Sequence, residues 1–182
     1  GNSFWAMIGN SMLFSIVGQV MTMYFTTTLA FVATKYKFYG RKFFWYASFF
    51  MNTIPLYGSG GQTYTLYYNL GFINSYSILL LNTAALGLGF MYFESMYQGM
   101  SNTYFEAADI DGANDWHKCY FIAIPLSMGL VTALFIMNWM SSWNAYGGAL
   151  IYHPKIPTFA AGIYLFQLQM RYGARADILY AA

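Results

Sequence analysis

The stretch EAADIDGAND, residues 106–115, has the residue types most suited to chemistry, because it carries four acids within ten residues. Clustered carboxylates could hold a metal ion or take part in catalysis. However, Asp109, Asp111 and Asp115 lack the ligand ladder and the distal bidentate Glu of an EF-hand loop. An isolated D-x-D pair is also weak evidence for an enzyme that acts on sugar nucleotides. We therefore expect no metal site here.

Other catalytic patterns do not stand out either. His117 and Cys119 are close in sequence, but the second histidine, His153, is distant, so the chain offers no zinc ligand set. The chain has no G-x-x-x-x-G-K-[ST] phosphate loop and no evident Ser/His/Asp or Cys/His arrangement. We expect a protein that is not an enzyme and needs no cofactor, so ATP-derived energy would have to come from a partner.

The composition is that of a membrane protein. Of the 182 residues, 58% are hydrophobic, 22% are aromatic and 8% are charged, whereas soluble domains carry about 25% charged residues. The net charge is only +2, and the one basic run, KYKFYGRK at 35–42, is best interpreted as a loop. We therefore expect no nucleic-acid partner, and we expect the lipid bilayer to surround most of the chain.

Charged residues divide the chain into helical segments. Residues 1–34, 43–93 and 119–154 contain no Asp, Glu, Lys or Arg, and about 20 apolar residues suffice for a membrane-crossing helix. The pattern predicts one all-α, polytopic membrane domain over residues 1–182, with crossings at 5–34, 43–66, 74–93 and 126–143. Pro55 and the glycines after it should kink or break the second helix. The chain shows no signal peptide and stops within an apolar segment, so we expect a fragment of a longer protein.

The two charged loops, 35–42 and 94–124, should lie on the same side of the membrane, because two crossings separate them. That side holds five Lys and Arg residues against three on the other side, which favours the cytoplasm. We interpret 94–124 as a cytoplasmic loop. Residues 144–175 then form an external loop with a partly buried or re-entrant piece near FAAGIYLFQ.

A short helix is predicted within the cytoplasmic loop, at residues 104–111. In such a helix Phe105 and Ala108 share one side, and Glu106 and Asp109 share another. Two adjacent alanines, at 107 and 108, would form an exposed small-residue face flanked by acids and suited to docking. A solvated loop of helix-forming residues is the alternative.

A glycine turn and a second short helix should follow. Gly112 should end the first helix in the left-handed conformation, and Asn114 is a suitable N-cap for the next. Asp115 would then lie in the first turn, where the helix dipole favours an acid.

The spacing of this loop is similar to the EAA loop of the permeases of binding-protein-dependent ABC transporters, which reads E-A-A, three residues, G, nine residues, I, one residue, L-P. The matching positions are Glu106, Ala107, Ala108, Gly112, Ile122, Ile124 and Pro125, and only Ile124 departs from the pattern. Features elsewhere resemble the carbohydrate-uptake branch of maltose-type permeases: IDGA at 110–113, FYGRK at 38–42, Trp143-Asn144 and PTFAAGIYLF at 157–166. Many sugar permeases have a basic residue where Glu94 stands and a proline near Ser101.

The resemblance covers the whole chain and implies the core of a MetI-like permease, a multi-pass protein of the bacterial inner membrane. It implies as partners a cytoplasmic ABC ATPase dimer, a second and usually different permease subunit, an extracytoplasmic solute-binding protein and a carbohydrate substrate. By position, the ATPase-coupling residues would be Glu106, Ala107, Ala108, Asp109, Gly112, Ile122 and Pro125. Glu106 would pair with a basic group of the ATPase, and the alanines would allow close seating.

The substrate path is less well defined by the sequence. Asparagines in apolar segments either hydrogen-bond between helices or line a path, and aromatic rings could stack on sugars. The candidates are Asn52, Asn82, Asn138, Trp139, Trp143 and Asn144. Two alternatives stay open: an autonomous channel, receptor or membrane-embedded enzyme, and a permease for a peptide, an amino acid or glycerol phosphate.

Overall fold

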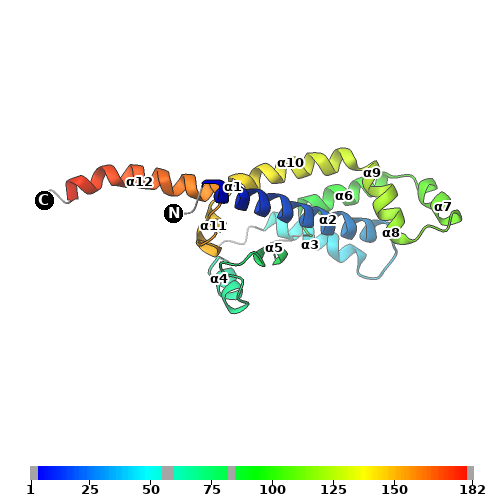
Figure 1. The fold of residues 1–182 in the computed structure, drawn as a ribbon. Helices are drawn as coiled ribbons and strands as arrows, with labels where there is room; N and C mark the ends of the chain where they lie inside the picture. The colour runs from blue at the N-terminus through cyan, green and yellow to red at the C-terminus, as the bar shows by residue number, and fades with distance from the viewer. Residues whose placement is uncertain (1–3, 55–59, 82–84, 180–182) are drawn as a thin grey trace. The chain divides into compact units, whose positions relative to one another are not determined.

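The computed structural model describes residues 4–54, 60–81 and 85–179, with side chains up to residue 171 apart from those of residues 80 and 81. Regular structure in these ranges is entirely helical, so the predicted all-α class is confirmed (Figure 1). The chain divides into two compact units. The loop unit comprises residues 19–57 and 81–138, and the terminal unit comprises residues 1–18, 58–80 and 139–182.

The loop unit contains the predicted cytoplasmic loop and the helices that support it. Its helices are α2 (Gly18–Lys35), α3 (Arg41–Thr53), α6 (Leu88–Gly99), α7 (Thr103–Ile110), α8 (Asp115–His117), the π-helix η2 (Lys118–Ala123), α9 (Ile124–Leu126) and most of α10 (Met128–Asn144). α3 packs along α6, and α7 packs against η2. The loop is therefore a folded part of this unit, because its helices contact one another and the core.

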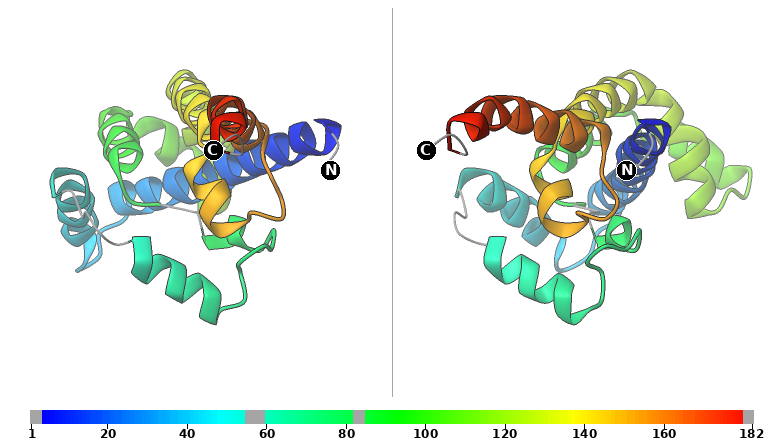
Figure 2. Two further views of the ribbon diagram at one scale, coloured as in Figure 1. Left: turned by 90° about the vertical axis from the view of Figure 1, so that its left-hand side faces the viewer. Right: turned by 60° about the vertical axis from the view of Figure 1, so that its left-hand side comes forward.

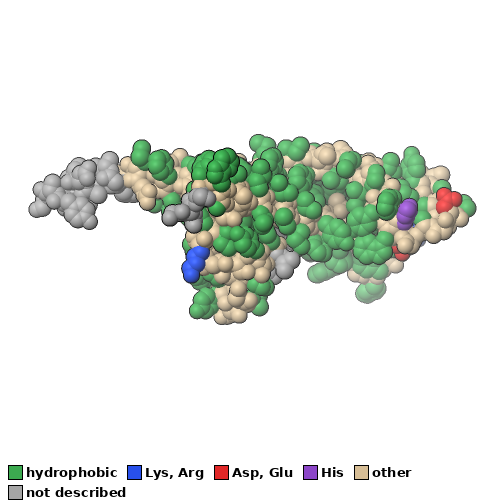
Figure 3. Space-filling view, viewed as in Figure 1, with side chains coloured by type: hydrophobic (Ala, Val, Ile, Leu, Met, Phe, Trp, Pro, Cys, Tyr) green, Lys and Arg blue, Asp and Glu red, His purple; other side chains and the backbone are tan. Residues whose placement is uncertain are grey.

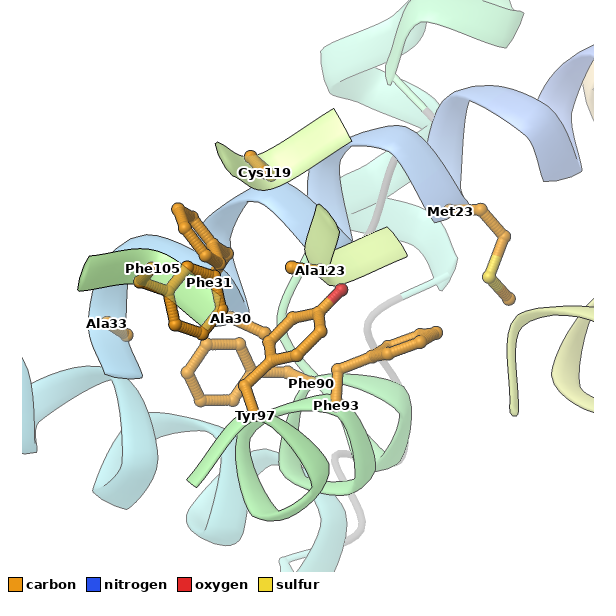
Figure 4. Close-up of a cluster of buried hydrophobic side chains, with 10 residues drawn as sticks. All are labelled: Met23, Ala30, Phe31, Ala33, Phe90, Phe93, Tyr97, Phe105, Cys119 and Ala123. Carbon is orange, nitrogen blue, oxygen red and sulfur yellow. The ribbon is translucent and has the colours of Figure 1, made fainter. Parts of the chain in front are cut away.

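A core of aromatic and small side chains holds the loop unit together (Figure 4). The Phe31 ring lies edge-on to the Tyr97 ring at a centroid distance of 6.0 Å, and 5.8 Å from the Phe105 ring. Such aromatic pairs contribute about 0.5–1.5 kcal/mol beyond the burial of their area. The full cluster comprises Met23, Ala30, Phe31, Ala33, Phe90, Phe93, Tyr97, Phe105, Cys119 and Ala123. It joins α2 and α6 to α7 and η2.

One continuous helical stretch is long and apolar enough to cross a bilayer. It runs over 32 residues, Phe4–Lys35, through α1 (Phe4–Met12), the π-helix η1 (Leu13–Val17) and α2. A second span would require the pair Asp115–Leu126 and Met128–Asn144, which is bent by 77° at Ser127. No further helix in the described ranges passes this test, whereas the sequence pattern predicts four crossings.

Two predicted helices are interrupted. The helix predicted at 43–66 ends at Thr53, and a separate helix, α4 (Gly60–Asn69), follows. Ile54 has an extended backbone, as expected of a residue before proline. Pro55 itself lies outside the described residues. The helix predicted at 74–93 is divided into α5 (Ile78–Leu81) and α6. Gly87 has a φ of 150°, which only glycine adopts cheaply, so a helix cannot run through it.

The terminal unit contains α1, η1, α4, α5, α11 (Gly147–Tyr152) and α12 (Phe159–Leu179), and α11 contacts both α4 and α12 (Figure 2). The start of α12 is fixed on α1, because the Phe159 N–H donates to the Ser11 hydroxyl at 2.7 Å. A Cβ at Gly162 would lie 2.6 Å from Met7 Sδ, so glycine permits this close approach. Within the predicted external loop 144–175, the piece expected to be partly buried or re-entrant near FAAGIYLFQ forms the start of α12, which begins at Phe159.

Candidate functional site

The helix α7 has one buried and one exposed face. Phe105 and Ala108 are each 8% exposed and pack inward, whereas Glu106, Ala107 and Asp109 are exposed. This division confirms the faces that the helical spacing predicts. The expectation of an exposed face made by both alanines is wrong, because Ala108 is covered by its own protein. Ala107 alone offers a small exposed side chain beside the acids.

A glycine turn ends α7. Gly112 has a φ of 75°, which confirms its predicted left-handed conformation. The N–H of Gly112 donates to the Asp109 carbonyl at 3.1 Å, and the N–H of Ala113 donates to the Ala108 carbonyl at 2.9 Å. These two bonds form a Schellman motif, which satisfies carbonyls that a helix end otherwise leaves unpaired. The chain reverses here with its backbone hydrogen bonds satisfied.

The second arm of the loop begins with a side-chain cap. Asn114 Oδ1 accepts a hydrogen bond from the His117 N–H at 2.8 Å, so the predicted N-cap is confirmed. The chain is then helical from Asp115 to Leu126. Two residues of the predicted coupling set lie in this arm: Ile122 is half-buried against the core, and Pro125 is exposed.

An ion-pair network joins the two arms. Lys118 Nζ pairs with Asp109 of α7 and lies 3.4 Å from Asp115 of α8. The Tyr36 hydroxyl and then Lys118 hold the pKa of Asp115 below its ordinary value, and Asp109 above all raises the pKa of Lys118. Lys118 is mostly buried, with 13% of its side chain exposed, whereas the two carboxylates are mostly in solvent.

Glu106 differs from Asp109 in having no such partner. Its carboxylate makes no hydrogen bond or ion pair with the residues that the structure describes, and it is exposed. Figure 3 shows acidic side chains over the α7 end of the chain, on a surface that is otherwise largely hydrophobic. Of the two acids on this face, Glu106 is therefore the one available to another molecule.

Lys35, at the end of α2, contacts the residues that precede and begin α7. Its Nζ donates to the Met100 carbonyl and to Asn102 Oδ1, both at 3.2 Å, and lies 4.5 Å from the centroid of the Phe105 ring. The end of α2 and the loop at 94–124 are therefore in direct contact. The sequence pattern placed Lys35 at the end of the first uncharged run, but its contacts with Met100, Asn102 and Phe105 join distant segments and have no signal in the sequence.

Two clefts flank α7. One, of about 270 Å³, is lined by Phe31, Lys35, Tyr36, Asn102, Phe105, Glu106, Asp109 and Lys118. The other, of about 430 Å³, is lined by Ala108, Asp111, Gly112, Ala113, Asn114, His117 and Ile122. Within the described residues no three His, Cys, Asp or Glu side chains come together as a metal site would require.

The asparagines proposed for the substrate path are not brought together by hydrogen bonds. Asn52 Nδ2 donates to the Ser48 carbonyl at 2.7 Å, and Asn144 Nδ2 donates to the Met140 carbonyl at 2.8 Å, so each bonds its own helix. Asn138 is exposed. Asn82 lies outside the described residues.

The two tryptophans proposed for the path do contact each other in the terminal unit. Trp139 and Trp143 have ring centroids 6.1 Å apart, and Trp143 lies 6.3 Å from Phe159. Trp139 Nε1 also donates to the Ser15 hydroxyl at 3.1 Å. Both rings therefore pack within the protein, Trp139 on η1 and Trp143 on the start of α12.

Similar proteins were found at the level of both sequence and fold. Residues 2–172 match the family described as "Binding-protein-dependent transport system inner membrane component". The chain is 27% identical over 178 residues to the arabinooligosaccharides transport system permease protein AraQ of Halalkalibacterium halodurans, covering 98% of this chain and 64% of AraQ. It is 31% identical over 146 residues to the sn-glycerol-3-phosphate transport system permease protein UgpE of Salmonella typhi, covering 79% of this chain and 51% of UgpE.

A solved structure shares the fold. It is a chain in the crystal structure of a bacterial ABC transporter involved in the import of the acidic polysaccharide alginate, with a TM-score of 0.74 and 23% identity. The match covers 92% of this chain and 59% of that chain. The chain spans at most about two thirds of the length of these proteins. From the match over residues 2–172, the chain belongs to the family of binding-protein-dependent transport system inner membrane components.

Proposed function

We propose that the full-length protein is a permease subunit of an ATP-driven importer in a bacterial inner membrane, and that α7 docks on a separate cytoplasmic ATPase subunit. The family supports this proposal, since its members are inner membrane components of binding-protein-dependent transport systems. Such a protein crosses the membrane several times and works with a second permease subunit and an extracytoplasmic solute-binding protein. ATP hydrolysis occurs on the ATPase subunit and not on this chain.

The observation that carries the proposal is the combination of an unpartnered Glu106 with a rigid support behind it. Glu106 is exposed on α7, while Phe105 on the opposite side is packed against Phe31. A force applied to the exposed face therefore reaches α2 through the core and η2 through the Lys118–Asp109 pair. An ATPase that binds this face differently in its two states shifts the permease between its own two states.

A sugar or oligosaccharide is the cargo that we propose. AraQ is named for arabinooligosaccharides, and the permease NgcG of Streptomyces coelicolor, 26% identical over 75% of this chain and 46% of its own length, is named for diacetylchitobiose uptake. Similarity to UgpE favours a second candidate, a phosphorylated polyol such as glycerol phosphate. Uptake of labelled solutes by cells with and without the gene separates these cargoes.

Glu106→Gln tests the docking role, with Asp111→Asn as the matched control. Both substitutions remove one exposed carboxylate charge from the same loop, but Asp111 lies off the Glu106–Asp109 face. Losing one partner of a charge pair that is buried and hydrogen-bonded in an interface costs about 2–5 kcal/mol. If docking buries Glu106 in this way, Glu106→Gln should weaken ATPase binding at least thirty-fold and abolish uptake. Asp111→Asn should change both by less than about three-fold. Normal uptake by Glu106→Gln, with the variant present in membranes at wild-type level, would refute the docking role.

Copurification tests the class of protein. The full-length permease, extracted in mild detergent, should bring down an ATPase and a second permease. An autonomous channel, receptor or membrane-embedded enzyme would instead show conductance or turnover when it is reconstituted alone. That result would overturn the proposal.

A further inference from the structure

A cleft of about 440 Å³ lies in the loop unit between α3 and α6, apart from the predicted coupling residues. Its walls are Arg41, Lys42, Trp45 and Tyr46 of α3 with Glu94 and Gln98 of α6. The set combines two cations, a carboxylate, an amide and two aromatic rings. This is the chemistry of a site for a ligand that carries both an anion and hydroxyl groups.

Neither cation is held by a direct side-chain contact in the part of the chain that the structure describes. Neither Arg41 nor Lys42 makes a side-chain hydrogen bond or an ion pair with described residues. Both stand in the first turn of the 13-residue α3, which holds no acid, and its N-cap Gly40 supplies no side-chain cap. The dipole of the 13-residue helix adds to the positive potential at its first turn.

The opposite wall supplies groups that bind hydroxyls. Glu94 is 7% exposed, and its Oε1 accepts a hydrogen bond from Gln98 Nε2 at 2.9 Å. The positive charge of Arg41 acts on this carboxylate across the cleft. A buried carboxylate beside an amide accepts hydrogen bonds from a polyol, and the cations on α3 offset its negative charge.

The α3 wall of the cleft also follows closely in the chain on the helical stretch that is long and apolar enough to cross a bilayer. The apolar stretch Phe4–Lys35 ends at Lys35, and α3 begins six residues later, at Arg41. Between and after them the aromatic side chains of Phe38, Tyr39 and Phe43 are exposed. Basic residues and aromatic rings directly after a membrane span are typical of contact with lipid headgroups.

We propose that this cleft binds the headgroup of an anionic glycerophospholipid with free hydroxyls, of the phosphatidylglycerol type. The phosphate lies against Arg41 and Lys42, and the headgroup hydroxyls donate to Glu94 and Gln98. Trp45 and Tyr46 line the side where the acyl chains leave for the bilayer. This site is independent of the proposed ATPase coupling and requires only that the chain lies in a membrane.

Lipid titration of the purified, assembled transporter tests the site. Bound lipid is counted by native mass spectrometry at pH 8, with phosphatidylglycerol, with phosphatidylcholine of the same chain length, and with free glycerol 3-phosphate. Each basic residue near an anionic headgroup contributes about five-fold in affinity. The Arg41→Gln, Lys42→Gln double variant should therefore lose on the order of thirty-fold for phosphatidylglycerol. Lys37→Gln, an exposed basic residue of the same segment outside the cleft, should change the affinity by less than two-fold.

Glu94→Gln should change the affinity for phosphatidylglycerol in the opposite direction. This variant tests the site even if the double variant does not assemble. Removing the carboxylate charge beside the phosphate while keeping a hydroxyl acceptor should tighten phosphatidylglycerol binding by about five-fold. Weaker or unchanged binding by this variant would overturn the proposal. So would equal binding of phosphatidylcholine, or a loss in Lys37→Gln as large as in the double variant. Binding of free glycerol 3-phosphate as tightly as the lipid would show that the ligand is a soluble phosphate.

Discussion

Gly112→Ala should loosen the turn between α7 and α8 by a calculable amount. A Cβ at this position meets nothing within 4 Å, so the substitution adds no clash, and its cost comes only from the φ of 75°. The left-handed conformation costs a residue with a Cβ roughly 1–2 kcal/mol. Since each 1.36 kcal/mol is a factor of ten, the turn should open about 5- to 30-fold more often.

Hydrogen exchange on the purified transporter measures this opening. The N–H groups of Gly112 and Ala113, which bond the Asp109 and Ala108 carbonyls, should lose protection by that factor. Gly112→Asn should lose less, because asparagine tolerates the left-handed region. Gly129→Ala is the control: this glycine also has open space but lies in the first turn of α10, without a left-handed φ, so alanine should not reduce protection there. Unchanged exchange in Gly112→Ala, or an equal loss in Gly129→Ala, would refute the reasoning.

Three further predictions concern the same loop. Asn114→Ala removes the acceptor of the His117 N–H and should destabilise α8 by about 1 kcal/mol, whereas Asn114→Ser keeps a side-chain cap. Amide hydrogen exchange of residues 115–118 in the two variants measures the difference. Phe105→Ala should cost about 3–5 kcal/mol and lower the Tm of the solubilised permease clearly, and an unchanged Tm would show that this core does not hold α7. The pKa of Asp115 in the folded protein is below its ordinary value of 3.8, so the ionised carboxylate stabilises the loop above pH 3.8, and this stabilisation is lost as the pH falls through the folded pKa. Amide hydrogen exchange of the loop, corrected for the intrinsic exchange rate, should show this loss of protection at low pH. The Asp115→Asn variant should not show it.

The local structure of the loop follows from the sequence because its signals act over short distances. Phe105 and Ala108 are apolar at a helical spacing, Gly112 is the residue that adopts the left-handed conformation cheaply, and Asn114 has a side chain short enough to cap the next helix. Each of these preferences depends on neighbours within four residues. They were therefore predictable without knowledge of the fold.

The helix boundaries were less predictable. The uncharged run 43–93 reads as two continuous crossings, but Gly87 interrupts the second of them with a φ of 150°. Isolated glycines such as Gly87 and Gly89 are compatible with a helix in an apolar segment, so the sequence pattern could not show this break. The start of α12 at Phe159 was likewise hidden, because aromatic and glycine residues there suit both a loop and a helix.

The sequence by itself determined that the chain is an all-α membrane protein and that residues 106–125 carry a family-specific pattern, since composition and short-range spacing are properties of the chain alone. Only the tertiary structure decided which acid is free. Glu106 and Asp109 are equivalent by helical spacing, yet Lys118, nine residues beyond Asp109, folds back to pair with Asp109 and leaves Glu106 exposed. The tertiary structure also decided that Ala108 is buried. It further decided that Arg41 and Glu94, more than fifty residues apart in the sequence, line one cleft. These outcomes depend on contacts between distant segments, which no local preference specifies.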